Sequence, residues 1–206
     1  MKKEIKNIVF DMGMVLMDFS MDRIIDPYFK DPEDKKLVYD VVWESGEWTT
    51  LDKGTISEDE ALASWVSKVP ERMKEPLRQM FAHWHETMFP VEGMAELIKE
   101  LKSNGYKCYL LSNTSVRFPV YKDSVESLSL LDGHFISAFH YLLKPDRRIY
   151  EKMLDTFGLD GEESFFVDDN KENVKSAASV GMRGFAFENF NIAALKEAMR
   201  KENIRI

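Results

Sequence analysis

Short apolar runs, separated by stretches with helical periodicity, constrain the fold of this chain more than any other feature. The strand candidates lie at residues 5–10, 106–111, 164–167 and 184–187, and within 135–143. Helical spacing of apolar side chains occupies residues 94–101, 146–157, 173–180 and 193–201. Strands that alternate with helices form parallel βαβ units. We therefore predict an α/β fold with a doubly wound, Rossmann-like parallel sheet.

The stretch at residues 18–89 differs from the rest because no strand pattern interrupts it. It contains all four tryptophans of the chain and much helical spacing. Ser57 is followed three positions later by Glu60, which is the pattern of a capping box at a helix start. We expect residues 18–89 to form an inserted helical cap on a core made of residues 1–17 and 90–206.

Charge and composition exclude several classes of protein. The 206 residues include 28 Lys and Arg against 36 Asp and Glu, which gives a net charge of −8. That balance argues against a nucleic-acid-binding surface, which would be basic. Cys108 is the single cysteine, so an internal disulfide and a multi-cysteine metal site are excluded. No apolar segment approaches the roughly 18 residues of a membrane span, and no signal-peptide pattern opens the chain. We expect a cytoplasmic protein.

Polar residues follow the predicted strands at the positions where ligands bind. In an open α/β sheet, ligands lie beyond the carboxyl ends of the strands. These ends carry Asp11, Ser112-Asn113, Lys144 before Pro145, and Asp168-Asp169. Carboxylates hold Mg²⁺ through oxygen, and such an ion is commonly bound together with a phosphate. A carboxylate can also attack phosphorus and form a covalent intermediate. The sequence therefore predicts a site for Mg²⁺ and a phosphate.

Four motifs in this order resemble those of the haloacid dehalogenase (HAD) superfamily of phosphohydrolases. They are residues 9–16 around Asp11, residues 110–113, Lys144-Pro145 before a helix, and residues 166–169 with Asn173. Each motif alone is weak, but all four stand at predicted strand ends. The resemblance covers the whole chain, because the helical stretch lies where the family inserts its first cap domain. It implies a phosphatase with an aspartyl-phosphate intermediate and Mg²⁺ as cofactor.

The resemblance also implies a set of metal ligands. Asp11 would be both the nucleophile and a ligand of Mg²⁺. Asp168 would be the second carboxylate on the metal, and Asp169 would bind through water or orient the site. The backbone carbonyl of Gly13 would supply a further ligand, which does not require a side chain.

The same resemblance implies how the phosphate is held. The Ser112 hydroxyl and the backbone N–H of Asn113 would donate to phosphate oxygens. Lys144 would balance the charge of Asp11 and of the transferred phosphoryl group. The substrate would be a small phosphate ester, and the protein a monomer or a homodimer.

Gly13 departs from the family pattern, because phosphatases of the family carry a second aspartate there as the acid and base. General acid–base help is worth about 10²–10⁴ in rate. Another group or a water could take the role, the leaving group could need little protonation, or turnover could be weak. An Asp-x-Gly branch that resembles this chain, with glucose-1-phosphatase-like and epoxide-hydrolase-N-terminal-like members, favours a sugar phosphate. Asp18 is a further candidate for handling the proton, or an anchor of the hinge.

Two other functions remain to be weighed. The chain could be a module that binds a phosphate ligand or regulates, with weak or no catalysis because of Gly13. The dehalogenases of the family carry an aromatic residue at that position and use no metal, so a dehalogenase ranks below a phosphatase.

Trp43 and Trp48 could line the cap face over the site or pack in a buried aromatic core.

Overall fold

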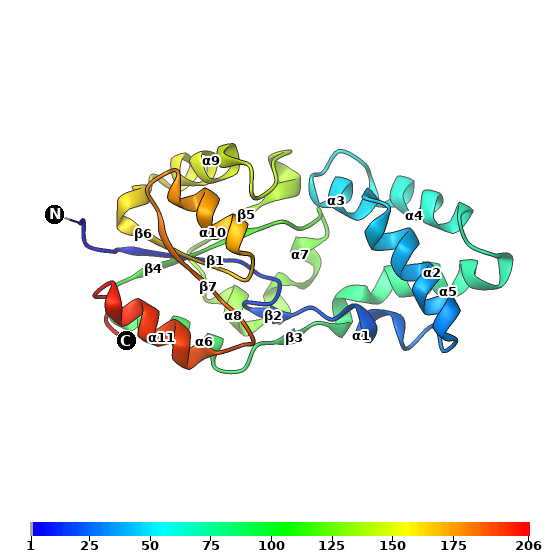
Figure 1. Cartoon of the computed structure of the whole chain (residues 1–206), viewed down its shortest axis with the longest axis horizontal. Coiled ribbons are helices and arrows are strands. Elements are labelled where there is room, and N and C mark those ends of the chain that lie inside the picture. The colour runs from blue at the N-terminus through cyan, green and yellow to red at the C-terminus, as the bar shows by residue number, and fades with distance from the viewer. Residues whose placement is uncertain (1) are drawn as a thin grey trace.

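The chain forms a five-stranded parallel sheet flanked by helices (Figure 1), as seen in a computed structural model that describes residues 2–206. Residue 1, with which the expected core begins, lies outside the described residues. The strands are β1 (Asn7–Phe10), β4 (Lys107–Ser112), β5 (Gly133–Ile136), β6 (Ser164–Asp168) and β7 (Arg183–Ala186). They lie in the order β5-β4-β1-β6-β7, and each neighbouring pair is parallel. The prediction of a doubly wound α/β sheet is confirmed.

Helices cover both faces of the sheet (Figure 1). One face carries α6 (Met94–Ser103) and α11 (Ile192–Lys201), and the other α9 (Arg147–Phe157) and α10 (Lys171–Ala178). The alternation of side chains in a strand explains the two layers. Ile8 of β1 packs in the core that α6 and α11 complete, whereas Val9 packs with α9. Shorter helical turns are α7 (Phe118–Tyr121), η3 (Lys122–Ser124), α8 (Glu126–Ser129), η4 (Ser137–Phe139) and η5 (Gly161–Glu163).

A helical segment stands beside the sheet, at its carboxyl edge (Figure 1). Its elements are α1 (Met21–Ile25), α2 (Pro32–Tyr39), the π-helical η1 (Asp40–Glu44), α3 (Glu47–Asp52), α4 (Glu58–Ser67), α5 (Glu71–His83) and η2 (Trp84–Thr87). The capping box predicted at the start of α4 is confirmed, with the Ser57 hydroxyl accepting from the Glu60 N–H. Aromatic rings form the core of the helical segment, where the ring of Trp48 stacks with those of Trp43 and Trp65, at centroid distances of 5.3 and 6.1 Å.

A two-stranded antiparallel ribbon marks the place where the chain enters and leaves this segment. It pairs β2 (Met17–Asp18) with β3 (Phe89–Pro90). The ribbon was not expected, because the sequence showed no strand pattern there. It lies at the two junctions of the predicted cap, and that division into core and cap stays a prediction.

Two contacts hold the helical segment against the loops that follow β4 and β5. The Arg117 guanidinium donates to both carboxylate oxygens of Glu58, at 2.9 and 2.7 Å, and to the Phe81 carbonyl at 2.6 Å. Gly54 lies so close to Ala138 that an added Cβ would be 2.2 Å from the Ala138 carbonyl oxygen. Gly54 also has a φ of +77°, which favours glycine. These contacts fix where α3 and α4 stand over the sheet edge.

The third strand of the sheet, β5, begins and ends earlier than expected. The apolar residues 135–143 predicted a strand ending at Lys144, but β5 ends at Ile136 and the chain then turns through η4. Lys144 therefore follows a loop and not the strand itself.

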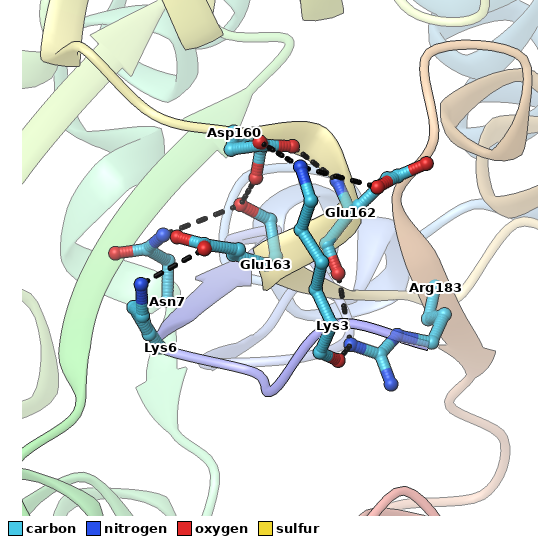
Figure 2. A network of polar contacts seen from close by, with 8 residues as sticks. Lys3, Lys6, Asn7, Asp160, Glu162, Glu163 and Arg183 are labelled. Atoms are coloured by element: carbon cyan, nitrogen blue, oxygen red, sulfur yellow. Dashed lines mark hydrogen bonds and ion pairs between the residues drawn. The ribbon is translucent and has the colours of Figure 1, made fainter. Parts of the chain in front are cut away.

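Ion pairs tie the opposite, amino-terminal edge of the sheet together, as Figure 2 shows. The Lys3 ammonium lies 2.7 Å from Asp160 and 3.2 Å from Glu162. The Arg183 guanidinium donates to the Lys3 carbonyl at 2.6 Å and to the Glu162 carbonyl at 2.8 Å. This network joins the segment before β1 to η5 and β7. Within residues 2–206, no helix is both long and apolar enough to cross a membrane.

Candidate active site

The carboxyl ends of β1 and β6 bring two aspartates to one buried lysine. Asp11 directly follows β1, where its N–H donates to the Val167 carbonyl at 2.8 Å, and Asp168 ends β6. The Lys144 ammonium lies 2.7 Å from Asp11 Oδ1 and 2.6 Å from Asp168 Oδ2. The Lys144 side chain is 1% exposed and that of Asp168 is 0% exposed. Such a buried pair is held only where both partners are well positioned.

The Asn113 amide positions the backbone of Lys144. Its Nδ2 donates to the Lys144 carbonyl at 3.0 Å, and its Oδ1 accepts from the Lys144 N–H at 2.9 Å. Two hydrogen bonds thus join the end of β4 to the loop after β5, so the lysine reaches the site although no strand leads to it. The amide is engaged in this way, and the Asn113 backbone N–H is the group that the resemblance assigned to phosphate.

The Asp168 carboxylate is fixed by two donors besides the lysine. Its Oδ1 accepts from the Asn170 N–H at 2.8 Å and from Asn173 Nδ2 at 2.9 Å. The Asn173 carbonyl in turn accepts from the Tyr150 hydroxyl at 3.0 Å. Asn173 belongs to α10 and Tyr150 to α9, so the helices on this face of the sheet orient the carboxylate.

Burial and charge perturb the groups around Lys144. Burial, together with the nearby Asp168 carboxylate, raises the pKa of Asp11 to about 7, although the Lys144 ammonium acts in the opposite direction. Burial disfavours the charged form of Lys144, yet Asp11 and Asp168 outweigh it and raise the lysine pKa. A bound cation would stabilise the ionised form of Asp11.

The residues at this edge fit a divalent cation. Asp11, Asp168 and Asp169 each offer an oxygen, and these oxygens lie within 4.8 Å of one another. Hard carboxylate oxygens are the ligands that Mg²⁺ prefers. Three carboxylates against one ammonium also leave an excess of negative charge that a cation would neutralise.

A cavity of about 210 Å³ opens above Asp11. Its polar lining includes predicted site residues, namely Asp11, Gly13, Ser112, Asn113 and Asp169, and also Thr114. Among the described residues, Asp18 is not part of the lining. Its carboxylate pairs with Arg23 at 2.6 Å, at the foot of the helical segment.

Most of the remaining lining is apolar and comes from the loop after β1 and from the helical segment. These side chains are Met12, Met14, Phe19, Trp48, Trp84 and Met88. Of the two tryptophans for which the sequence left a choice, Trp48 lines the cavity and also packs in the aromatic core. Trp43 stacks on the ring of Trp48.

One acidic residue in the lining, Asp52, was missed by the sequence reasoning. It ends α3 and lies four positions after Trp48, so both side chains are on one face of that helix. Burial of its carboxyl group and the charge of Asp11 raise its pKa well above the usual range, and a hydrogen bond from Trp48 opposes them. No sequence signal marks Asp52, because an acid on a helix surface is ordinary.

Comparison with protein families places the chain in a known group. Residues 5–181 match the family model described as haloacid dehalogenase-like hydrolase. The matched residues include Asp11, Ser112, Lys144 and Asp168, which the structure brings to one edge of the sheet.

Individual relatives agree with this match. The chain is 30% identical over 180 residues to a sesquiterpene phosphatase of Aspergillus oryzae, covering 87% of this chain and 88% of that one. It is 26% identical to a D-ribitol-5-phosphate phosphatase of Bacteroides thetaiotaomicron, over 90% and 93% of the two chains. A magnesium complex of a HAD family enzyme from the same bacterium has a similar fold, with a TM-score of 0.69 and 24% identity over 93% and 99% of the chains.

Proposed function

Because the chain belongs to the haloacid dehalogenase-like hydrolases, we propose that it hydrolyses a small phosphomonoester with Mg²⁺ and a covalent intermediate on Asp11. The observation that carries the proposal is the Lys144 ammonium, which lies within 2.7 Å of the carboxylates of both Asp11 and Asp168 under one cavity. A buried lysine in this place holds Asp11 with one oxygen occupied. The other oxygen is left to attack phosphorus.

The chain's own groups account for the two displacements. Asp11 attacks phosphorus and the bond to the leaving-group oxygen breaks, after which water attacks the aspartyl phosphate and frees Asp11. The Lys144 ammonium, the Ser112 hydroxyl and the Asn113 N–H stabilise the negative oxygens of the phosphoryl group during both steps. Splitting the reaction in this way replaces one difficult displacement by two easier ones.

The metal ligands in this proposal are Asp11, Asp168, Asp169 and the Gly13 carbonyl. When bound, Mg²⁺ would neutralise charge on the phosphoryl group and on the attacking carboxylate. Without it, the three carboxylates would repel a phosphate dianion, because the single positive charge of Lys144 does not offset them.

The lining of the cavity favours a leaving group with apolar surface. Aromatic and methionine side chains line the space above Asp11, and most of the polar lining comes from the ends of the strands, with Asp52 of α3 as the acidic group from the helical segment. Two relatives represent an apolar and a sugar-like leaving group, since one is named a sesquiterpene phosphatase and the other a D-ribitol-5-phosphate phosphatase. We place an apolar organic group first. The sugar phosphate expected from the sequence stays a prediction.

Phosphate release from a panel of esters tests the proposal. The panel contains nitrophenyl, alkyl and prenyl phosphates beside sugar phosphates, each measured with Mg²⁺ and again with EDTA. We expect release that requires metal and is fastest for esters with an apolar group. Release that is unaffected by EDTA would contradict the role of the metal, and a preference for sugar phosphates would contradict the apolar leaving group.

Asp11→Asn tests the nucleophile, with Asp59→Asn on the exposed surface of α4 as the matched control. We expect the Asp11 variant to lose turnover of every ester and the control to keep it. Near-normal turnover by the Asp11 variant would overturn the proposal. A folded wild-type protein that binds phosphate esters and releases no phosphate would favour a binding or regulatory module.

A further inference from the structure

The proposed reaction lacks a proton donor at the position where the sequence resemblance expects one. Gly13 carries no side chain, and an added Cβ would meet no atom within 4 Å. The space beside Asp11 at this point is open. A proton for the leaving group must therefore come from elsewhere in the cavity or from water.

We propose that Asp52, which reaches the cavity from α3, is the catalytic acid and base that Gly13 does not supply. The inference rests on the proposed function, because it concerns the leaving group of that reaction. Three carboxyl groups line the cavity in the described part of the chain, and they belong to Asp11, Asp52 and Asp169. Asp11 is the nucleophile and Asp169 stands at the metal site, so Asp52 alone has no other assigned task.

A hydrogen-bonded connection to the loop after β4 holds the backbone of Asp52 in place. The buried Ser137 hydroxyl donates to the Asp52 carbonyl at 2.5 Å and accepts from the Thr114 N–H at 2.9 Å. Thr114 follows the Ser112-Asn113 pair that ends β4. One hydroxyl thus links the backbone of Asp52 to the strand end that faces the phosphate.

The contact of Gly54 with Ala138, two residues further on, holds the same end of α3 against the loop after β5. Asp52 therefore belongs to the helical segment but is held at a fixed position relative to the edge of the sheet. An acid that must reach a leaving group within hydrogen-bond distance needs this kind of support.

The surroundings of the carboxyl group favour its proton-carrying form. Burial and the nearby Asp11 charge both act in that direction and outweigh the hydrogen bond from Trp48, so the pKa of Asp52 is raised. Asp11 and Asp52 share one cavity but differ in their neighbours, since only Asp11 touches the Lys144 ammonium. Two carboxyl groups whose surroundings differ in this way suit two different roles, a nucleophile and an acid.

The proton balance closes over the two steps. As Asp11 forms its bond to phosphorus, the leaving oxygen takes the proton of Asp52 and departs as an alcohol, which leaves Asp52 ionised. In the second step Asp52 takes a proton from the attacking water. The bond between phosphorus and Asp11 then breaks, inorganic phosphate leaves, and both aspartates return to their starting states.

Leaving-group dependence tests the inference in the full-length protein with Mg²⁺ present. Nitrophenolates leave without a proton, whereas simple alcohols need one. In single-turnover measurements we expect Asp52→Asn to slow release of the alcohol from alkyl phosphates by about 10²–10⁴ and to leave the burst of nitrophenolate from para-nitrophenyl phosphate nearly intact. Steady-state kcat should fall for both esters, because both pass through the aspartyl phosphate whose hydrolysis uses Asp52 as the base. Asp40→Asn, in the neighbouring η1 and outside the cavity lining, is the matched control and should behave as wild type.

A retained burst of nitrophenolate shows that the Asp52 variant is folded. An equal slowing of leaving-group release from nitrophenyl and alkyl esters would overturn the acid role, because a merely structural change does not distinguish leaving groups. Full activity on alkyl esters would overturn it as well. Either result leaves Asp11 as nucleophile, provided that Asp11→Asn is inactive on both esters, so the two proposals fail separately.

Discussion

Arg117 joins two helices of the helical segment to the loop after β4, and its removal should have a large effect on stability. Three of its nitrogens donate hydrogen bonds, two to the Glu58 carboxylate at the start of α4 and the other to the Phe81 carbonyl near the end of α5. The Arg117 side chain is 13% exposed and that of Glu58 is 26% exposed. The pair is therefore mostly withdrawn from water, with its charges matched in a two-pronged geometry.

The expected cost of Arg117→Met lies between those of surface and buried pairs. An exposed ion pair contributes about 0–1 kcal/mol, whereas breaking a fully buried one costs about 3–5 kcal/mol. Because water can still reach part of Glu58, we expect a loss of about 3 kcal/mol in the free energy of unfolding. For a chain of this size, that loss lowers the Tm by about 6–12 °C.

Thermal and urea unfolding of four proteins would measure this effect. They are the wild type, Arg117→Met, Glu58→Gln and the double variant, which together give the coupling energy of the pair. We expect a coupling of about 1–2 kcal/mol, with Arg117→Met costing more than Glu58→Gln because it also removes the donor to the Phe81 carbonyl. Arg148→Met is the control, since Arg148 pairs with Asp146 on the open surface. A Tm for Arg117→Met that equals that of Arg148→Met would refute the reasoning.

Three further predictions follow from the same contacts. Gly54→Ala should cost about 1–3 kcal/mol more than Gly105→Ala in urea unfolding, because both glycines have a positive φ but only the first meets a carbonyl oxygen; equal costs would contradict the close approach. The raised pKa of Asp52 means that the folded protein keeps a proton that the unfolded chain loses above about pH 4. Stability should thus fall as pH rises from there, and Asp52→Asn should flatten that slope in urea titrations; an unchanged slope would count against it. Finally, Mg²⁺ should raise the Tm of the wild type, and less so that of Asp169→Asn; equal shifts would remove Asp169 from the metal site.

The sequence alone was sufficient to predict the sheet and the edge at which several candidate residues meet. Parallel strands place their carboxyl ends at one edge, so Asp11 and Asp168 could be brought together without coordinates. Their meeting with Lys144 is observed at 2.7 and 2.6 Å. The prediction that a strand leads directly to Lys144 was wrong, because the apolar residues before it do not continue β5. Hydrogen bonds from the Asn113 amide position the loop that carries the lysine.

The other side of the site could not be predicted, because it depends on contacts between distant segments. Asp52 faces the cavity because Ser137 and Ala138 contact the end of α3. The sequence of α3 itself does not indicate these contacts. The ribbon of β2 and β3 has two residues in each strand, which is too short for a periodic pattern. Helical spacing predicted the helices of the segment, but it left open which faces look toward the sheet.

The central place of β1 has a consequence for how the chain folds. This strand precedes all the others, yet its partners β4 and β6 begin 100 and 157 positions later. During synthesis β1 must wait for both, whereas the helices between residues 21 and 87 can form from local contacts as soon as they emerge. Until β4 and β6 are complete, the apolar strand at residues 7–10 stays unpaired, so folding of the sheet is expected to be the slow stage and the stage most exposed to aggregation.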